Sequence, residues 1–319
     1  MEFNAHAFTL GALISTRLKV ILGLVVVCMI WGTTWIAIKV GLRSMPPAFG
    51  ASLRFLLASL FLLGLIEFRH IQFPRDRTFW NLGILMGLSS FGIPLALVYW
   101  GTQFIPTGLA SILFATYPFA VSLFSYFLLP KERLTRPKLA GILLGFIGIY
   151  IIFASEFSFQ SNLAVEGMFA IILSSGMQAF ALVTVRKYGG PYNVMSLNYV
   201  GMVIGGVALG IMSYFVERHE GIVFNQEAIL SLVYLALFGS VVTFVTYFWL
   251  VKHVEVVLLS LTAFVTPIIA VIAGVIVFHE VLTLQMIAGS TLVLFGIVIA
   301  NSNDLINVLK RGKSMLLDS

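Results

Sequence analysis

The sequence predicts an all-α membrane protein whose ten transmembrane helices form two inverted five-helix repeats around a central cavity. Apolar residues run without interruption over bilayer-length segments, basic residues gather on one side of those segments, and residues of the first half recur in the second. Only 10% of the 319 residues are charged. Soluble domains carry roughly 25% charged residues, so this chain has too few charges to solvate a globule of its size.

Segments that cross lipid must bond their own backbone groups, and a helix needs about 20 apolar residues to do so. The continuous runs exclude a β-barrel, in which apolar residues alternate along short strands. The first run is longer than the roughly 7–15 residues of a signal-peptide core, so we expect a retained helix. The ten segments that qualify are Val20–Val40, Ala48–Glu67, Phe79–Gly101, Thr107–Leu129, Lys138–Ala154, Val165–Val185, Val194–Val216, Ala228–Val251, Val256–Phe278 and Gln285–Asn301.

The positions of the basic residues test this count independently. With the amino terminus inside, fifteen Lys and Arg residues face inward, three (Lys39, Arg43 and Arg218) face outward, and Arg54 lies within a helix. This is the positive-inside bias, and a missed helix would invert every later loop. We therefore expect a multi-pass protein of a bacterial cell inner membrane, with residues 1–19 and 302–319 cytoplasmic. Because the basic residues occupy short spacers and form no continuous surface, nucleic acid is not expected as a partner.

Residues of the first half recur at a nearly constant distance. Trp100, Ser111 and Pro118 are followed 149 positions later by Trp249, Ser260 and Pro267. The run Glu132-Arg-Leu-Thr recurs 148 positions later as Glu280-Val-Leu-Thr. Since each unit has five helices, the second copy enters the membrane in the opposite orientation, an arrangement typical of transporters. We predict repeats over 20–154 and 165–301.

Pro118 and Pro267 lie at the middle of the fourth and ninth segments. Each removes an amide donor and frees a carbonyl one turn earlier, which favours a midplane site with hinges at the two prolines. A simple packing kink is the alternative. The polar residues beside the prolines, which would contact a solute or satisfy the freed groups, are Thr116, Tyr117, Thr262 and Thr266.

The first segment carries Trp31, Thr34 and Trp35 on one helical face, because they are spaced by three and four residues. Two large rings and a hydroxyl could line a pocket for an apolar or aromatic solute. A Trp belt at the membrane boundary is the alternative, and it is the preferred interpretation for Tyr99 and Trp100 at the outer end of the third segment.

Three further polar residues lie within segments. Ser90 and Gln178 are candidates for contact with a solute, although hydrogen bonding between helices explains most such residues. Arg54 could attract a carboxylate of the solute, since a buried cation normally faces a cavity or a partner. The competing interpretation is that Arg54 extends its side chain to the nearby outer boundary.

All thirteen Asp and Glu residues lie in loops, termini or segment edges. Any ion coupling would therefore involve an edge carboxylate such as Glu280 or Glu132, and exchange or facilitated diffusion are the alternatives. His279-Glu280 begins like a zinc motif, but Thr283 replaces its second His. No metal or cofactor is expected. An enzyme acting on lipid is the competing function, but it predicts a polar catalytic cluster that the sequence lacks.

Glycines four residues apart, such as Gly141 and Gly145 in the fifth segment and Gly201 and Gly205 in the seventh, permit close helix contact. We expect these two helices to serve as scaffold or as a homodimer surface.

The run Trp31-Gly-Thr-Thr-Trp-Ile-Ala-Ile-Lys39, the pair Arg54-Phe55 and the two Glu-x-Leu-Thr elements followed by Ala-Gly resemble EamA-type drug/metabolite transporters. The resemblance covers both halves. It implies secondary transport by alternating access through a cavity between the halves, often export of amino acids, other metabolites or drug-like compounds. It implies a small-molecule solute as the partner and no enzymatic activity. Gly176-Met-Gln-Ala-Phe180 departs from the family pattern, in which a tryptophan is expected in the sixth helix.

Overall fold

The computed structural model describes residues 2–130, 132–156, 162–253 and 256–302. All regular elements among these residues are helical. The helices are α1 (Glu2–Gly41), α2 (Pro47–Phe68), α3 (Arg77–Met86), η1 (Gly87–Gly92), α4 (Ile93–Thr102), α5 (Thr107–Phe114), α6 (Tyr117–Leu128), α7 (Arg136–Glu156), α8 (Asn162–Tyr188), α9 (Val194–Val216), α10 (Gln226–Val233), η2 (Tyr234–Val242), α11 (Thr243–His253), α12 (Val256–Phe278) and α13 (Leu284–Ala300).

Several helices join end to end into longer apolar spans. Among them, α3, η1 and α4 make one span, as do α5 and α6. In the described residues, eight helices are long and apolar enough to cross a membrane, and the shorter apolar helices Thr262–Phe278 and Leu284–Ala300 follow them. The prediction of an all-helical, multi-pass membrane protein is confirmed. The arrangement as ten helices in two inverted repeats stays a prediction.

Large apolar side chains cover the outside of the bundle. Phe68 is 82% exposed, Tyr150 74% and Phe215 72%. Soluble monomers rarely expose contiguous apolar surface on this scale, so the surface suits lipid rather than water.

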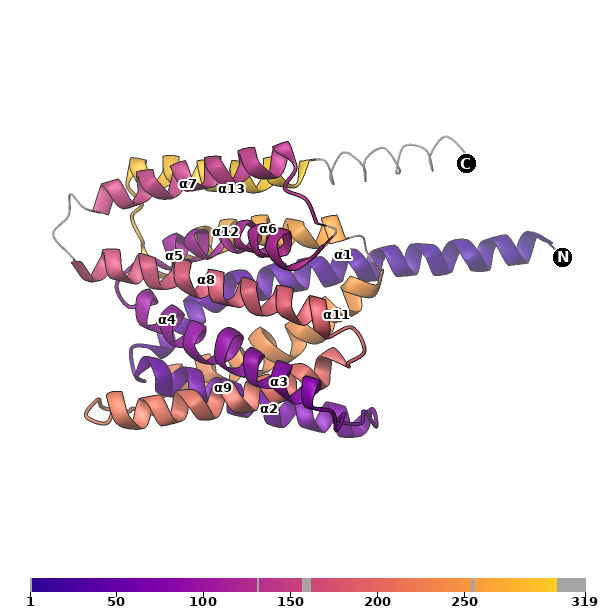
Figure 1. The fold of residues 1–319 in the computed structure, drawn as a ribbon, viewed down its shortest axis with the longest axis horizontal. Helices are drawn as coiled ribbons and strands as arrows, with labels where there is room; N and C mark the ends of the chain where they lie inside the picture. The colour runs from indigo at the N-terminus through magenta and orange to yellow at the C-terminus, as the bar shows by residue number, and fades with distance from the viewer. Residues whose placement is uncertain (1, 131, 157–161, 254–255, 303–319) are drawn as a thin grey trace.

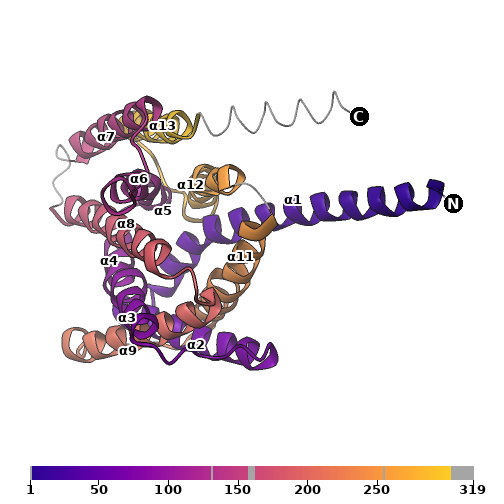
Figure 2. The same cartoon turned by 45° about the vertical axis from the view of Figure 1, so that its right-hand side comes forward.

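The helix α1 is longer than the first predicted segment. It begins at Glu2, so the residues that we expected to precede the membrane helix continue it. Its amino-terminal part projects beyond the other helices (Figures 1 and 2).

The helices α7 and α13 lie side by side at one face of the bundle (Figures 1 and 2). A Cβ atom on Gly148 would lie 2.5 Å from the carbonyl oxygen of Gly289, and one on Gly141 would collide with the carbonyl oxygen of Gly296. The two backbones therefore touch where the side chains are absent. In α9, a Cβ atom on Gly205 would meet the backbone of η1. These glycines therefore contact other helices of the same chain, so they are not available as a surface for a homodimer.

The two mid-segment prolines behave differently. The helix α5 ends at Phe114 and α6 begins at Tyr117, so Pro118 occupies the first turn of a new helix, where its missing N–H needs no partner. Pro267 lies inside α12, which continues through it. A helix break therefore accompanies only the first proline.

Two π-helices interrupt the third and eighth predicted segments. η1 begins at Gly87 and η2 at Tyr234, 147 positions later. The wide turns leave carbonyl groups without their usual partners, and hydroxyls serve some of them. Ser240 Oγ donates to the carbonyl of Leu235 at 3.0 Å, and Thr243 Oγ1 donates to that of Phe238 at 2.6 Å.

Candidate functional site

Arg54 of α2 points into the bundle. The residue is 7% exposed. Its Nε donates to Ser240 Oγ at 3.2 Å and its Nη2 to the carbonyl of Gly239 at 3.4 Å, both in the middle of the α10–η2–α11 span. The guanidinium therefore does not extend to the bundle surface, which decides against the boundary interpretation of this residue.

Tyr99 of α4 lies beside this guanidinium. It is 3% exposed, so the expectation that it belongs to a boundary belt is wrong. Its hydroxyl is buried and makes no hydrogen bond of regular geometry among the described residues, and it interacts with the Arg54 guanidinium through charge and a side-chain hydrogen-bonding contact. The missed signal was its spacing from Phe91: eight residues is about two helical turns, and both rings face the core.

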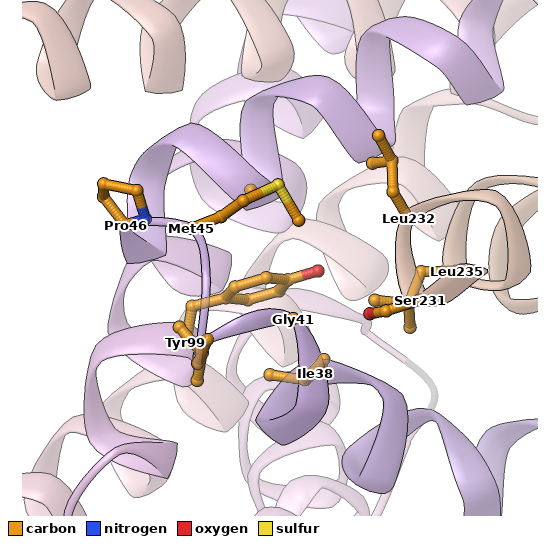
Figure 3. A pocket seen from close by; sticks show the side chains of 10 residues that line it. Ile38, Gly41, Met45, Pro46, Tyr99, Ser231, Leu232 and Leu235 are labelled. Carbon is orange, nitrogen blue, oxygen red and sulfur yellow. The ribbon is translucent and has the colours of Figure 1, made fainter. Parts of the chain in front are cut away.

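The Tyr99 ring also lines a small cavity between α1, α2, α4 and α10 (Figure 3). The other walls include Ile38, Met45, Ser231 and Leu235. Its volume of about 10 Å³ is close to the space that one water needs. The bundle is therefore closed around this point in the conformation described.

Trp31, Thr34 and Trp35 lie on α1 as the spacing predicted, and the two rings have different neighbours. The Trp31 ring lies 5.3 Å from the ring of Tyr247 between centroids. Trp35 is 7% exposed, and its ring lies 5.7 Å from that of Phe114. Thr34 is buried and donates to the carbonyl of Trp31 at 2.7 Å. Trp35 is therefore buried within the bundle, whereas Trp31 is only partly buried.

The polar residues near Pro118 connect α5 and α6 to their neighbours. Thr116 Oγ1 and Ser175 Oγ of α8 lie 2.9 Å apart and share a hydrogen bond. The ring of Tyr117 stacks on that of Phe114 with 6.0 Å between centroids. Thr116 therefore joins two helices and also donates to the carbonyl of Leu113 at 2.7 Å, while Tyr117 extends the aromatic group around Trp35.

The remaining candidates are more dispersed. Ser90 is half-buried in η1, and Gln178 Nε2 donates to Ser174 Oγ at 3.1 Å within α8. Thr262 is buried in α12, and Thr266 Oγ1 is buried with no hydrogen-bond partner among the described residues. Close to Thr266, the missing side chain of Gly32 brings α1 against α12: a Cβ atom there would lie 3.2 Å from the Thr266 carbonyl oxygen.

An ion pair joins the carboxyl end of α1 to the loop before α13. Lys39 Nζ lies 3.3 Å from Glu280 Oε1, and the side chains are 27% and 8% exposed. Glu280 also accepts from the backbone N–H groups of Thr107 at 2.7 Å and Gly108 at 3.3 Å, the first residues of α5. Lys39 donates a second bond to the carbonyl of Ile105. We call this the Glu280 end of the bundle.

The opposite end, which we call the Glu132 end, carries a related pair. Arg186 Nη2 lies 3.1 Å from Glu132 Oε1, with side chains 61% and 29% exposed. Lys138 Nζ lies 3.8 Å from the other carboxylate oxygen. This cluster is more open to solvent than the pair of Lys39 and Glu280.

A wide depression of about 550 Å³ opens at the Glu280 end. Its walls include Lys39, Arg43, Gln103 and Phe278. The Arg43 guanidinium lies 5.1 Å from the centre of the Phe278 ring and Lys39 Nζ lies 5.8 Å from it, so both cations face one aromatic surface.

In the part of the chain described, no three His, Cys, Asp or Glu residues gather into a group that could hold a metal ion. A buried cation beside aromatic rings can bind a solute, and ion pairs at the ends can open and close. An apolar helical bundle with these features defines a multi-pass membrane protein of the solute-transporter class. The EamA-like transporter family matches residues 18–154 and again residues 165–302, and the chain belongs to this family.

Similar proteins carry transporter names. The chain is 28% identical over 283 residues to the "Uncharacterized transporter YoaV" of Bacillus subtilis, covering 88% of this chain and 95% of that protein. It is 30% identical over 247 residues to the "Uncharacterized inner membrane transporter YedA" of Escherichia coli K12, covering 77% and 78%. A solved structure titled "Crystal structure of protein" matches with a TM-score of 0.63 at 17% identity, covering 88% of this chain and 95% of that one, which supports the fold alone. The transporter names point away from an enzyme.

Proposed function

We propose that this protein is a secondary transporter that moves a small solute by alternating access between two inverted repeats. The observation that carries the proposal is the matching of ion pairs at the two ends. Glu132 and Glu280 are 148 positions apart, and their basic partners Arg186 and Lys39 are 147 apart. One rearrangement can therefore open one end while it closes the other.

The helix contacts support the same symmetry. α1 packs on α12, and their counterparts five segments away, α8 and α6, also pack together. Likewise α2 contacts η2 while α9 contacts η1. These contacts join the halves 20–154 and 165–301. Each contact between a helix of the first half and a helix of the second therefore has an equivalent in which the two halves have swapped roles. The π-helices at Gly87 and Tyr234 follow the same offset.

The charge bias assigns the Glu280 end to the outside and both termini to the cytoplasm. An inner-membrane location agrees with the name of the Escherichia coli relative. With Glu280 buried and the cavity beside Tyr99 nearly filled, the conformation described is closed toward the outside. Export of a small metabolite, such as an amino acid or a drug-like compound, fits this topology.

We place the solute path between the halves. Its hinges would be the helix break at Pro118 and the kink-prone turn at Pro267. The residues that we propose to line it are Trp31, Thr34, Trp35, Arg54, Ser90, Thr116, Tyr117, Gln178, Thr262 and Thr266. An enzyme acting on lipid is less well supported, because the named relatives are transporters.

Flux measurements in proteoliposomes test the proposal. Purified protein would be reconstituted and screened with radiolabelled amino acids, polyamines, nucleosides and dyes, by counterflow so that no driving ion is presupposed. We expect at least one class to exchange faster than in protein-free liposomes. If correctly folded protein exchanges none of these classes, the transporter proposal fails.

A further inference from the structure

We infer that Arg54 and Tyr99 form the binding site for the carboxylate of the transported solute. This inference rests on the proposed transport function and names the chemistry of its substrate. Four observations in the described part of the chain carry it: the charge of Arg54 without an acidic partner, the missing side chain at Gly239, the buried hydroxyl of Tyr99 and the aromatic surface that begins at Phe55.

No acidic side chain among the described residues balances the charge of Arg54. In the described residues, the ion pairs involve Lys39, Arg43, Lys138 and Arg186, whereas the partners of Arg54 are all neutral: Ser240, Gly239, Tyr99 and the ring of Phe55. A guanidinium carries five N–H donors, so these partners leave donors for another group. A buried, unneutralised cation is strongly unfavourable in an apolar interior and is normally kept there for a functional partner.

The backbone of η2 approaches this guanidinium at Gly239, which has no side chain. A Cβ atom on Gly239 would lie 3.4 Å from Arg54 Nη2 and 3.0 Å from Thr34 Cγ2. Any side chain here would fill the space beside Nη2 and crowd Thr34. The glycine therefore keeps the space beside Nη2 free of a side chain from η2.

The Tyr99 hydroxyl supplies a second, independent indication of a ligand. It is buried, makes no hydrogen bond of regular geometry among the described residues and lies on the wall of the cavity in Figure 3, into which it points. An unpaired buried hydroxyl is unfavourable unless a ligand or water completes it. As a donor next to a guanidinium, it is suited to the oxygen of an anion.

The rest of the solute would face an aromatic surface. The Phe55 ring lies 5.2 Å from Phe91, Phe91 lies 6.3 Å from Phe244, and Phe244 lies 6.3 Å from Trp31 between centroids. This row starts at the residue after Arg54. We therefore assign the solute a single carboxylate joined to an apolar or aromatic body. A carboxylate matches the planar fork of one guanidinium, whereas a phosphate dianion would need a second cation.

The test compares matched acid and amide pairs by isothermal titration in detergent, so that binding is measured without flux. The probes are acetate, phenylacetate and indoleacetate with their amides, and benzylphosphonate as the dianion. We expect at least one acid to bind at least tenfold more tightly than its amide, and phenylacetate to bind more tightly than benzylphosphonate. If no acid exceeds its amide, or if the phosphonate binds most tightly, the carboxylate assignment is overturned.

Variants then locate the site. Arg54→Gln should weaken binding of the preferred acid at least tenfold and leave its amide within twofold, while Tyr99→Phe should weaken it severalfold. Arg54→Lys keeps the positive charge and tests whether weaker binding by Arg54→Gln comes from the lost charge or from misfolding. Arg218→Gln, an exposed arginine, is the matched control and should bind as the wild type does. Equal binding by Arg54→Gln and the wild type would refute the site even if flux is found, whereas absence of flux with intact acid binding would refute only the transport proposal.

Discussion

Replacing Glu280 by glutamine should loosen the Glu280 end of the bundle. The carboxylate holds Lys39 Nζ at 3.3 Å and the first backbone N–H groups of α5, at Thr107 and Gly108. Glutamine keeps the size of the side chain but removes the charge. It also turns one acceptor into a donor that faces another N–H group.

The magnitude follows from the burial of this pair. Removing one partner of a buried ion pair typically costs about 3–5 kcal/mol. Lys39 is 27% exposed and retains its bond to the Ile105 carbonyl, so we expect a cost somewhat below that range, about 2–3 kcal/mol. At about 1.4 kcal/mol per factor of ten, the equilibrium between the closed and open forms of this end should shift roughly 30- to 100-fold toward open.

Cysteine labelling can measure this shift, because the sequence contains one cysteine, Cys28. In a Cys28→Ser background, Ser231→Cys places a thiol on the wall of the closed cavity, at a residue that is 5% exposed. A membrane-impermeant maleimide added outside spheroplasts should then react 30- to 100-fold faster when Glu280→Gln is also present, if opening limits access. Gly274→Ala keeps the charge but pushes a methyl group against the Glu280 carboxylate, so it should act in the same direction.

The matched control is Glu227→Gln, which removes an exposed carboxylate 3.9 Å from Arg43. Exposed pairs contribute about 0–1 kcal/mol, so labelling should change less than about fivefold. Labelling that stays the same in folded Glu280→Gln and Gly274→Ala would refute the view that this carboxylate closes the end.

Three further changes test other parts of the molecule. Trp35→Phe should weaken titrated solute binding severalfold while Tm stays within a few degrees, and unchanged affinity would remove this ring from the path. Gly141→Leu should separate α7 from α13 and abolish the monodisperse peak in size-exclusion chromatography, whereas Gly176→Leu should not, since a Cβ atom there meets nothing within 4 Å. The hydrogen bonds from Tyr192 Oη and the α3 backbone hold the pKa of Asp76 below its ordinary value of 3.8, so this carboxylate stabilises the fold above pH 3.8 and loses its effect as the pH falls below it. Tyr192→Phe should therefore lower Tm at pH 6, the difference from the wild type should shrink as the pH falls below 3.8, and a difference independent of pH would contradict this.

The helical segments could be predicted because a single segment in lipid can bond all its backbone N–H and C=O groups only as a helix. The run that became α9 was predicted as Val194–Val216, and the helix has the same bounds. The π-helices could not be predicted in this way. Pro94 follows η1 and lacks the N–H that a regular turn would use, but Tyr234–Val242 contains no proline, so the residue types do not indicate both π-helices.

The site was predictable in its residue types more than in its geometry. Helical spacing fixes a common face for Trp31 and Trp35, but it does not say which ring is buried against which helix. Arg54 is a long side chain whose Cα position allows it to reach either the boundary or the interior, so the sequence left both open. Tyr99 was misjudged because its distance from the segment end suggested a boundary, whereas the depth of a residue also depends on how the neighbouring helices cover it.

Both ends of the bundle carry a Glu paired with a basic residue, but the two ion pairs differ in how far they are buried. The Glu280 side chain is 8% exposed beside Lys39, and the Glu132 side chain is 29% exposed beside Arg186, which is itself 61% exposed. A transporter that closed both ends equally would trap its solute, and one that closed neither would leak. The difference between the two pairs is therefore what we expect of one conformation in a two-state cycle.

The repeat offset also identifies what Glu132 would hold in the opposite conformation. Thr107 begins α5 and Val256 begins α12, 149 positions later. In the exchanged state, we expect Glu132 to accept from the first N–H groups of α12, as Glu280 now does from Thr107. Each state would then contain one buried carboxylate at one helix start, so the two would have similar free energies. When two conformations have similar free energies, a solute that binds one of them more tightly by a few kcal/mol can shift the population from one to the other.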